Sequence, residues 1–401
     1  MSRETHRITL EEALALATSA ARPLAFEQVS THEALGRVLA EQVHYASALP
    51  PFDHAAMDGY AIADAAAVGA DFRVHGESRA GVPAGERALV GTAVAISTGA
   101  ALPEGTDTVV PWEHVTREGD RVRLLAAAQL GQHVRRAGED AAAGAVAVAA
   151  GTRLGPRHLG ALAVAERAVI DVSRRPRVLL AITGDELREP GAPEGLGLVV
   201  DSNGPMLAAL ATRAGATVVR VRVPDSADAL RAFLGSAVAG ADLVATVGGA
   251  ADGEHDHVAR VLRELAAETL FRGVAIKPGK PVGLASLGGV PVLSLPGNPG
   301  SAYVTFALFG LPILRVLAGE TPTSRHVRAR LAAPLRAPSD RSAIHYGALE
   351  VREGVLVFLP ALNAASGSVP GVASASALAL VPPGASLGKD ALVDAIDLDV
   401  P

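Results

Sequence analysis

The second half of the chain alternates continuous apolar runs with longer stretches of helical period. Between residues 177 and 319, the runs RVLLAIT and TVVRVRV are followed by segments in which apolar residues recur at helical spacing, such as SNGPMLAALATRAGA and SADALRAFLGSAVA. Further expected strands are DLVATVGG, LFRGVAI and VPVLSLP, and further expected helices are HVARVLRELAAE and GSAYVTFALFGLPILRVLAG. Apolar strands separated by helices are typical of a parallel sheet covered on both faces. The pattern therefore predicts a doubly wound, mostly parallel α/β domain over residues 176–319.

The segments on either side of this domain follow other patterns. The chain begins with a helical pattern in which Thr9 would be the N-cap and Glu12 would close a capping box. Short alternating runs such as DFRVHG and VAIST predict small strands, and PRHLGALAVAE predicts one more helix. Four domains are expected: a discontinuous N-terminal helical and linking domain (1–48 and 141–175), a small β-rich domain (49–140), the α/β domain (176–319) and a C-terminal β domain (320–401).

Composition narrows the possible functions. The 401 residues are 49% hydrophobic and 19% charged, which suits a folded chain of several domains. The formal charge of -6 and the 3% of aromatic residues argue against a nucleic-acid-binding protein. The absence of cysteine excludes disulfides, thiolate metal sites and a cysteine nucleophile. Because Glu11 and Glu12 interrupt the N-terminal apolar stretch and no long apolar run is evident, we expect no membrane span and a cytoplasmic protein.

Polar clusters follow several of the expected strands. They are TGDEL at 183–187, GGAADGEHDH at 248–257, KPGKP at 277–281 and PGNPGS at 296–301. In open α/β sheets, ligands bind outside the carboxyl ends of the strands. Each cluster alone is a weak signal, but four clusters on one rim predict a ligand site.

Two of these clusters favour an anionic ligand. Lys277 and Lys280 lie in a rigid frame made by Pro278 and Pro281, and two ammonium groups suit a phosphate or another oxyanion. A solvated turn with two ordinary lysines is the alternative for this segment alone. PGNPGS adds backbone N–H groups, a helix N-terminus and the hydroxyl of Ser301. Together the two segments favour anion binding.

The acidic clusters beside this anion site favour Mg²⁺. Asp185 and Glu186 follow one expected strand, and Asp256 lies in a glycine-bracketed loop after another. Magnesium takes oxygen ligands and commonly bridges carboxylates and phosphates. Surface polarity is the alternative for the histidines of this loop, and the chain has neither an EF-hand loop nor a P-loop. We therefore expect Asp185, Glu186 and Asp256 to be metal ligands.

Three polar segments of the first half are harder to interpret. They are PPFDHAAMDGYAI at 50–62, STGAALPEGTDTVVPWEHV at 97–115 and RRAGED at 135–140. Asp58-Gly59 by itself is best explained as a tight turn. The chemistry of these residues does not connect them to the α/β rim.

In order and spacing, these segments resemble the molybdopterin molybdenumtransferase (MoeA-type) family, which includes the E domain of gephyrin. The matching pieces are PPFDHAAMDGYAI, STGAALPEGTDTVV, RRAGED, TGDEL, DSNGPML, VGGAADGEHDHV, IKPGKPV and LPGNPGSA. The resemblance implies an elongated homodimer of four-domain subunits. It also implies a reaction in which adenylylated molybdopterin and molybdate give molybdenum cofactor and AMP with Mg²⁺, and a molybdopterin adenylyltransferase as a possible partner.

The resemblance also implies roles for particular residues. The implied catalytic residues are Asp58, Thr98, Asp140, Glu186, Asp225, Asp256, Lys277 and Lys280. The implied substrate-binding residues are Thr183, Gly184, Asp185, Asp201, Ser202, Asn203, Gly248, Gly249, Gly253, Pro278, Gly279, Pro296, Gly297, Asn298, Pro299 and Ser301. Asp58, Thr98 and Asp140 would complete the cleft by facing the α/β domain of the partner subunit.

The chain departs from the family pattern at four positions. Ala55 and Ala251 stand where the family has serine, Gly300 replaces the valine of PGNPVS, and Tyr346 stands near an expected arginine. These changes leave two alternatives open. One is a degenerate paralogue that carries molybdopterin or binds a partner without inserting metal. The other is an adenylyltransferase or a nucleotide pyrophosphatase built on a related α/β domain, although the segments at 50–62 and 97–115 argue against it.

Overall fold

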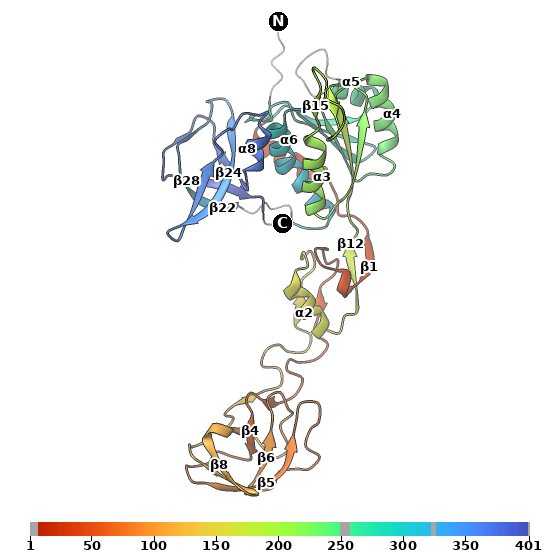
Figure 1. Ribbon diagram of the computed structural model, residues 1–401. Coiled ribbons are helices and arrows are strands. Elements are labelled where there is room, and N and C mark those ends of the chain that lie inside the picture. The colour runs from red at the N-terminus through yellow and green to blue at the C-terminus, as the bar shows by residue number, and fades with distance from the viewer. Residues whose placement is uncertain (1–6, 249–256, 322–325, 400–401) are drawn as a thin grey trace.

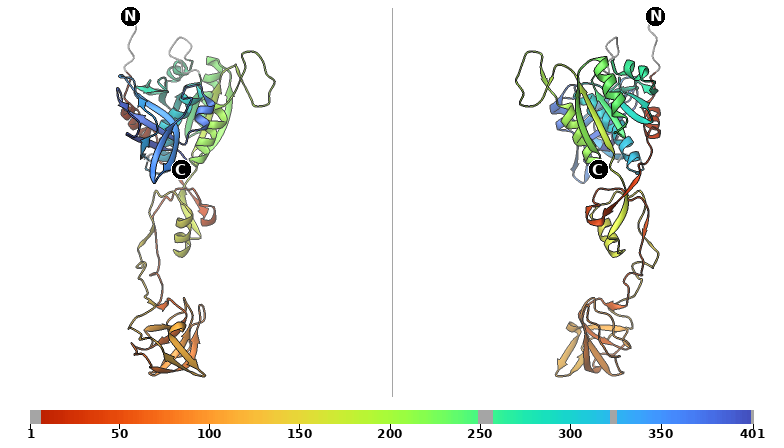
Figure 2. Two further views of the ribbon diagram at one scale, coloured as in Figure 1. Left: turned by 60° about the vertical axis from the view of Figure 1, so that its left-hand side comes forward. Right: turned by 90° about the vertical axis from the view of Figure 1, so that its right-hand side faces the viewer.

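The computed structural model describes residues 7–248, 257–321 and 326–399. The chain is elongated, with an α/β layer and a C-terminal β domain packed together at one end (Figure 1). A slender neck leads from them to a separate β-rich domain at the other end, and two further views show the same separation (Figure 2). The chain runs down the neck to the β-rich domain and returns along it before it enters the α/β layer.

The α/β layer has a six-stranded sheet of order β16-β13-β17-β21-β20-β18. The first four strands are parallel, and β20 and β18 are antiparallel to their neighbours. The strands are β13 (Arg177–Thr183), β16 (Thr217–Val223), β17 (Leu243–Val247), β18 (Glu268–Arg272), β20 (Gly283–Leu287) and β21 (Val290–Leu295). The helices are α3 (Asn203–Arg213), α4 (Ala227–Ala237), α5 (His257–Glu264), α6 (Pro299–Thr305) and α7 (Leu311–Leu317), with a π-helical segment at Phe306–Gly310 between the last two. The predicted doubly wound, mostly parallel sheet is confirmed.

The strand order creates a switch point between β13 and β17. From β13 the chain crosses to β16 on one side, and from β16 it returns past β13 to β17 on the other. The two crossovers therefore leave in opposite directions from the middle of the sheet, and the loops that follow β13 and β17 diverge at their carboxyl ends. This is the usual position of a ligand crevice in doubly wound sheets.

Three details differ from the sequence prediction. The expected strand LFRGVAI is split, because β18 ends at Arg272 and Ile276–Lys277 (β19) pairs with the C-terminal domain instead. Strand β20 was not predicted. Within 1–48, the structure has one α-helix, α1 (Leu10–Ser19), and the expected helical pattern is wrong for Phe26–Ser30, which forms β1.

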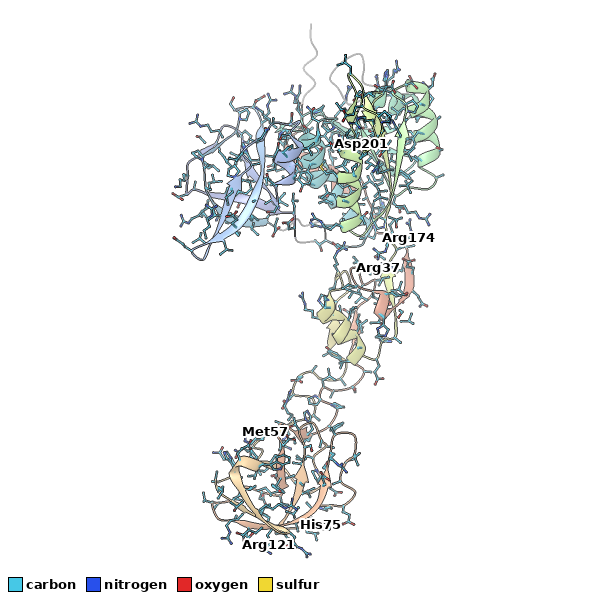
Figure 3. All side chains as sticks on the ribbon, in the orientation of Figure 1. Arg37, Met57, His75, Arg121, Arg174 and Asp201 are labelled. Atoms are coloured by element: carbon cyan, nitrogen blue, oxygen red, sulfur yellow. The ribbon has the colours of Figure 1, made fainter. Side chains whose placement is uncertain are left out.

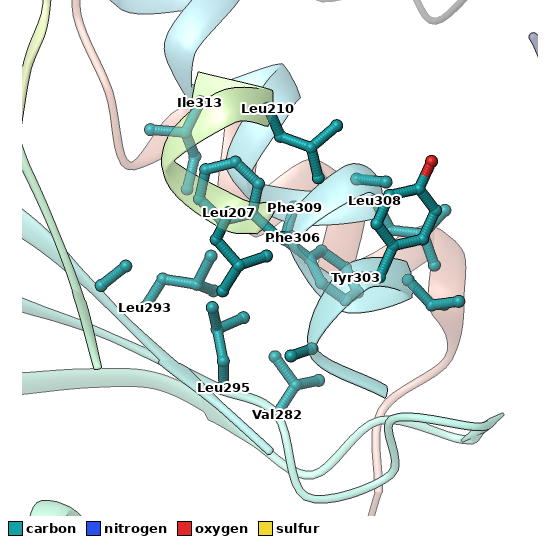
Figure 4. Close-up of a cluster of buried hydrophobic side chains, with 14 of the residues drawn as sticks. Leu207, Leu210, Val282, Leu293, Leu295, Tyr303, Phe306, Leu308, Phe309 and Ile313 are labelled. Atoms are coloured by element: carbon teal, nitrogen blue, oxygen red, sulfur yellow. The ribbon is translucent and has the colours of Figure 1, made fainter. Parts of the chain in front are cut away.

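The largest hydrophobic core lies between one face of the sheet and helices α1, α3, α6 and α7. Leu207 of α3 packs with Leu293 and Leu295 of β21 and with Phe306 and Phe309 (Figure 4). Helix α1 contributes buried residues to this core, although the sequence grouped it with the linking domain. Its capping box is present as predicted, with Thr9 Oγ1 accepting from the Glu12 N–H group. Helices α4 and α5 cover the other face of the sheet in a second core.

One segment of the described chain, Pro299–Leu317, is long and apolar enough to cross a membrane by length and composition alone. In its most apolar window, 83% of the residues are buried inside the protein. Continuous apolarity is expected of a helix that is surrounded by a core. This burial accounts for its composition.

The neck consists of paired strand segments and one helix. Strand β1 pairs with β12 (Val169–Ser173), β2 (Val43–His44) pairs with β11 (Val146–Val148), and α2 (Pro156–Val164) and the 3-10 turn Thr31–Glu33 pack beside them. Arginines join the neck to the α/β layer. Arg153 donates to the Gly36 carbonyl and to the Ala214 carbonyl across the joint, and Arg174 makes a two-pronged ion pair with Asp242 at 2.6 and 2.7 Å.

The β-rich domain contains a six-stranded sheet of order β7-β4-β6-β5-β9-β8. Its strands are β4 (Gly59–Ile62), β5 (Asp71–Ser78), β6 (Thr92–Ile96), β7 (Thr108–Pro111), β8 (Val115–Glu118) and β9 (Arg121–Leu124), with a small ladder of β3 (His54–Ala55) and β10 (Val134–Arg135) beside it and a 3-10 turn at Trp112–His114. DFRVHG and VAIST were predicted to be strands, and they coincide with β5 and β6 apart from the last two residues of VAIST.

The C-terminal domain is a closed β structure. Strands β24, β25, β22, β28 and β26 form a ring, because β24 pairs with β26 as well as with β25, and β19 joins at β24. The strands are β22 (His326–Leu331), β24 (Ser342–Arg352), β25 (Val355–Pro360), β26 (Ala377–Val381) and β28 (Leu392–Asp397), with a ladder of β23 (Leu335–Arg336) and β27 (Ser386–Leu387) and the short helix α8 (Val369–Ala373). One face of this sheet shares the large core with the α/β layer through Ile344, Tyr346 and Leu378.

Candidate active site

Residues that follow three strands of the sheet meet at its carboxyl rim. Thr183, the last residue of β13, donates from Oγ1 to the Val247 carbonyl at the end of β17 (3.1 Å). Asn203, the first residue of α3, donates from Nδ2 to the carbonyl of Gly297 in the turn after β21 (2.7 Å). The Gly248 N–H group donates to the Leu295 carbonyl (3.3 Å). These bonds place the turns after β13, β17 and β21 and the start of α3 in one cluster, which we call the rim cluster.

Gly248 is required by the packing of this rim. Its φ is +94°, and a Cβ atom built on it would lie 2.6 Å from Thr183 Oγ1 and 2.7 Å from the Thr183 carbonyl oxygen. The chain after β17 therefore lies directly against the end of β13, and no side chain separates them. Backbone groups line the crevice at this point, as a phosphate-binding turn requires.

The carboxylates of the rim have different surroundings. Asp185 is exposed, and its Oδ1 accepts from the Asp225 N–H group (3.4 Å), so the turns after β13 and β16 are adjacent. Asp201 is buried: it accepts from the Gly204 N–H group (2.8 Å) and lies 3.7 Å from Arg220. Its carboxylate stabilises the start of α3, and Ser202 is the N-cap residue of that helix. The Asp185 carboxylate therefore contacts the backbone of Asp225 at the crevice.

A metal site of three side chains is not formed by the described part of the chain. Glu186 is exposed, with its carboxylate folded back over Gly184. The predicted metal ligand Asp256 lies outside the described residues, as do Gly249, Gly253 and the departure at Ala251. Asp185 and Glu186, which are adjacent in the turn after β13, are the two predicted metal ligands that the structure describes.

The KPGKP turn lies where the α/β layer meets the C-terminal domain. Lys277 belongs to β19, which pairs with Ser342–Ala343 of β24. The turn does not follow a strand of the α/β sheet, as the sequence predicted, but precedes β20. Because β20 runs antiparallel to β21 and Gly283 pairs with Ser294, the turn is still at the level of Pro296–Gly297 at the rim. Lys277 is exposed and Lys280 is half-buried.

The turn is held against α6 through Gly279. Gly279 is buried with φ +105°, and a Cβ atom there would lie 2.4 Å from Thr305 Cγ2. The Gly279 carbonyl accepts from the Val282 N–H group and the Lys280 carbonyl accepts from the Val274 N–H group, both at 3.0 Å. Pro278 precedes this glycine, so the backbone between the two lysines has little freedom.

The first turn of α6 contacts a loop of the C-terminal domain. The Gly300 N–H group donates to the Ser366 carbonyl (2.7 Å), and Asn298 Nδ2 donates to Ser366 Oγ (3.3 Å). Pro299 has no N–H group to donate. Among the described residues of the first turn, only Ser301 has an N–H group without a hydrogen bond to a backbone carbonyl. The N-terminus of α6 therefore has fewer N–H groups available to an anion than the sequence predicted, because the C-terminal domain of the same chain already accepts one of them.

Gly300 and Tyr346, two of the departures from the family pattern, are neighbours. A Cβ atom on Gly300 would lie 3.2 Å from the Tyr346 hydroxyl oxygen. Tyr346 is buried, donates to the Ala365 carbonyl (2.7 Å), and its pKa is raised by burial. The tyrosine occupies space that a larger residue at position 300 would need, and it brings no positive charge to this junction.

His345 lies beside the lysine turn on the C-terminal domain. Its Nε2 donates to the Arg336 carbonyl (3.2 Å), and burial lowers the pKa of its imidazole, with the positive charge of Lys277 acting in the same direction. Protonation of the ring is therefore disfavoured in the folded protein.

We expect the free energy of unfolding to fall as the pH drops below about 6.5, the ordinary pKa of histidine. Below that pH the unfolded chain binds a proton at His345 more readily than the folded chain does, and above it both forms are neutral. His345→Gln keeps an amide donor. It should reduce the difference between the free energies of unfolding at pH 7.5 and pH 5.5, both measured by urea denaturation. His32→Gln, at an exposed histidine, serves as the control, and an equal difference in both variants would contradict the assignment.

The three polar segments of the first half converge at the neck end of the β-rich domain. Asp58 Oδ1 accepts from the N–H group (2.8 Å) and the hydroxyl (3.3 Å) of Thr98. The Asp140 N–H group donates to the Leu49 carbonyl (2.9 Å), and Arg135 pairs with Asp140 at 2.6 Å. We call Asp58, Thr98, Arg135 and Asp140 the distal cluster.

Asp53 ties the RRAGED loop to this cluster. Its carboxylate accepts from the Ala137 N–H group (2.8 Å) and from Arg136 (2.6 Å). These hydrogen bonds lower the pKa of Asp53, the backbone bond most of all. Sequence reasoning did not single out Asp53, Arg135 or Arg136, although the two arginines of RRAGED, followed closely by two acidic residues, were a signal that could have identified the arginines.

Within one chain, the rim cluster and the distal cluster are on opposite sides of the neck. Figure 3 labels Asp201 in the α/β layer and Met57, the neighbour of Asp58, at the neck end of the β-rich domain. Neither cluster contributes a side chain to the other in the described structure.

Comparisons with known proteins agree with this architecture. Residues 8–165 match a family model described as the MoeA N-terminal region (domain I and II), and residues 180–316 match one described as a probable molybdopterin binding domain. A Nostoc protein named molybdopterin molybdenumtransferase is 36% identical over 383 residues, which cover 92% of this chain and 88% of the relative. This chain belongs to the MoeA family.

Other MoeA-family proteins extend the comparison. A Bacillus subtilis molybdopterin molybdenumtransferase is 32% identical over 370 residues, covering 89% of this chain and 86% of the relative. A crystal structure of a MoeA protein from Pyrococcus horikosii superimposes with a TM-score of 0.82 at 30% identity, covering 98% of this chain and 99% of that one. The resemblance inferred from the sequence motifs is confirmed, and the fold of this MoeA-family chain matches that of the Pyrococcus protein over nearly its whole length.

Proposed function

We propose that this protein is a molybdopterin molybdenumtransferase that inserts molybdate into adenylylated molybdopterin and releases AMP and molybdenum cofactor. The observation that carries the proposal is the rim cluster at the switch point of the sheet, beside a rigid two-lysine turn, in a chain of the MoeA family. We further propose that the reaction takes place in the cytoplasm. The chain has no cysteine, so its fold does not depend on disulfides, which are rare in that compartment.

The roles of the rim residues follow from their chemistry. Lys277, Lys280 and Ser301 would neutralise and orient the oxyanion. Because Tyr346 is neutral, the lysines carry most of this work in the present chain. Thr183, Gly184, Gly248, Pro296 and Gly297 would place backbone groups along the pyrophosphate. Asn203, Asn298 and Pro299 hold the walls of this crevice in place.

Mg²⁺ would be held by Asp185 and Glu186 together with Asp256, with Asp225 as a further candidate, and would neutralise charge on the phosphates. Stabilisation of the charge that develops on a leaving phosphate commonly contributes more to the rate than any other single effect. The carboxylates would therefore act through the metal and through bound water. A substrate dithiolene supplies the sulfur ligands of molybdenum, so the absence of cysteine is compatible with the reaction.

The test is an assay of AMP release and cofactor formation with purified protein, adenylylated molybdopterin, Mg²⁺ and molybdate. We expect AMP release that depends on molybdate. Tight binding of the pterin without AMP release would overturn the proposal and favour a carrier that binds molybdopterin without inserting metal.

We further propose a homodimer in which the distal cluster of one subunit completes the rim cluster of its partner. Exposed apolar side chains are close in sequence to both clusters: Phe52 and Met57 are near Asp58, and Leu196 and Leu198 belong to the segment between Asp185 and Asp201. Exposed apolar side chains near a polar site are compatible with an interaction surface. Because the neck separates the two clusters within one chain, a second subunit is needed to bring Asp58, Thr98 and Asp140 to the phosphates.

Mixing of inactive subunits tests this arrangement. Lys280→Ala and Asp58→Asn should each inactivate the homodimer. In a mixed dimer, one site carries both changes and the other carries neither, so random exchange at equal amounts should restore about a quarter of wild-type activity. AMP release is measured before and after exchange. Subunit exchange is verified by mass spectrometry of the intact dimer. If AMP release does not recover although subunits have exchanged, the two clusters either serve separate functions or act together within one subunit.

A further inference from the structure

The neck is attached to the α/β layer through a narrow crossing of two chain segments. Residues 20–26 lead from α1 into β1, and residues 173–177 lead from β12 into β13. The two segments are paired here, because β1 pairs with β12 and the Arg174 N–H group donates to the Ala25 carbonyl (3.0 Å). The connection is thin in both views of Figure 2. A ribbon of only two strands is not rigid by itself, so the crossing restrains the direction of the neck weakly.

The hydrophobic cores on the two sides of the crossing are separate. The core of the neck contains residues such as Leu39, Leu162 and Ile170, and the large core of the α/β layer contains residues such as Leu207 and Leu293. No residue of the described chain belongs to both cores. Domains without a large apolar interface are expected to move relative to each other unless other contacts hold them. The direction of the neck therefore depends on polar contacts.

Arg153 makes such contacts from outside the crossing. In the neck, its Nη1 donates to the Gly36 carbonyl (2.8 Å). In the α/β layer, its Nη2 donates to the carbonyl of Ala214, the C-cap residue of α3 (3.0 Å), and its Nε lies 2.5 Å from Oε1 of Glu320, just after α7. One guanidinium group therefore joins the neck to two separate parts of the layer, whereas Arg174 belongs to the crossing itself.

The surroundings of Arg153 suit a guanidinium group. The C-terminus of a helix such as α3 favours a cation. A Cβ atom on Gly215 would lie 3.1 Å from Arg153 Nη1, so a side chain there would crowd the group. Glu320 Oε1 is buried and accepts no hydrogen bond within the described residues, so its charge is balanced by nearby cations. Arg315 is a second such cation: burial lowers its pKa, and Glu320 opposes this shift.

Helix α3 connects this contact to the rim cluster. Its C-terminal end receives Arg153, and its first residue, Asn203, donates to the Gly297 carbonyl at the rim (2.7 Å). Buried residues of α3 belong to the large core of the layer. The direction of the neck is therefore set against the same helix that forms one wall of the crevice.

We propose that Arg153 is a positioning residue that fixes the direction in which the neck leaves the α/β layer. The distal cluster lies at the far end of the neck (Figure 1), so a small change of angle at the crossing moves that cluster by a much larger distance. The consequence for the reaction rests on the function proposed above and on its shared site.

Distances between spin labels, measured by pulsed electron paramagnetic resonance on the full chain, test this proposal. The chain has no cysteine, so labels attach only at introduced cysteines. Ala163→Cys in α2 and Ala232→Cys in α4 replace exposed residues on the two sides of the crossing. Labelled chain is diluted with an excess of unlabelled chain, so that only distances within one subunit are measured. We expect a narrow distance distribution in the labelled parent and a broader one after Arg153→Ala.

A second label pair and two further variants make the result specific. Ala163→Cys with Val146→Cys reports on the neck alone and should keep a narrow distribution in Arg153→Ala. Arg157→Ala removes an exposed arginine of α2 and should change neither distribution. Glu320→Ala removes a partner on the other side and should broaden the distribution across the crossing. An unchanged distribution across the crossing in Arg153→Ala would overturn the proposal. Broadening of both pairs would also overturn it, because the neck would then have lost its own fold.

Kinetics test the consequence for the reaction. Arg153→Ala should lower kcat for AMP release by about tenfold or more, because displaced catalytic groups lose rate steeply. Arg157→Ala should keep the wild-type rate. A wild-type kcat in Arg153→Ala would overturn the positioning role in the reaction. If the wild-type protein releases no AMP, the proposed function fails, and the distance measurement still decides whether Arg153 fixes the neck.

Discussion

Replacement of Lys280 by alanine should abolish molybdate-dependent AMP release. We expect kcat/KM to fall by about 10²- to 10³-fold, the loss that typically follows removal of a preorganised group that stabilises developing charge. Lys280 is half-buried at the level of the Pro296–Gly297 turn, and Tyr346 brings no compensating charge. Steady-state AMP release measures the effect.

The sequence offers a matched control for this experiment. The chain contains only three lysines, and the third, Lys389, is exposed in the C-terminal domain. Lys389→Ala removes the same charge from the same chain and should keep wild-type activity. Circular dichroism of both variants checks that the fold is intact. Wild-type rates in Lys280→Ala would remove the lysine turn from the mechanism.

Replacement of Gly279 by alanine should destabilise the protein by about 3 kcal/mol and inactivate it. The residue has φ +105°, which disfavours a side chain, and the new methyl group would lie 2.4 Å from Thr305 Cγ2. The overlap is relieved if the lysine turn moves away from α6, or if Thr305 rotates and loses its hydroxyl bond to the Ser301 carbonyl. Urea denaturation measures the stability, and AMP release measures the position of the lysines.

Two further variants separate backbone strain from overlap. Gly288 also has a positive φ, +58°, but a Cβ atom there meets nothing within 4 Å, so Gly288→Ala should cost about 1 kcal/mol. Thr305→Ser removes Cγ2 and keeps the hydroxyl that donates to the Ser301 carbonyl (2.7 Å). Adding it to Gly279→Ala should recover part of the lost stability and activity. If the two glycine variants lose equal stability, the contact with Thr305 is not what holds the turn.

Local patterns in the sequence were enough to predict most of the α/β layer. Continuous apolar runs become strands such as β13 and β17 because both of their faces are buried by helices, and this requires no knowledge of the partner strand. Thr9 and Glu12 likewise close their capping box within one helical turn. Motif order and spacing were also enough to identify the family, since they need only the linear chain.

Other features depended on contacts between distant residues. The strand LFRGVAI was split because Ile276–Lys277 pairs with Ser342–Ala343, a preference that neither segment shows alone. The Gly300 N–H group was expected to be available to an anion, and only the packing of the C-terminal domain places the Ser366 carbonyl against it. The proximity of Tyr346 to Gly300 has the same origin.

Hydrophobic periodicity and short motifs were therefore enough to predict the doubly wound layer, the polar segments that follow or border its strands, and membership in the MoeA family. Each of these features depends on residues that are close together in the chain. The grouping of the polar segments into two clusters, one at the switch point of the sheet and one across the neck, became visible only in the folded structure. The reason is physical: strand order, crossover direction and the pairing of β19 with β24 are set by contacts between distant parts of the chain.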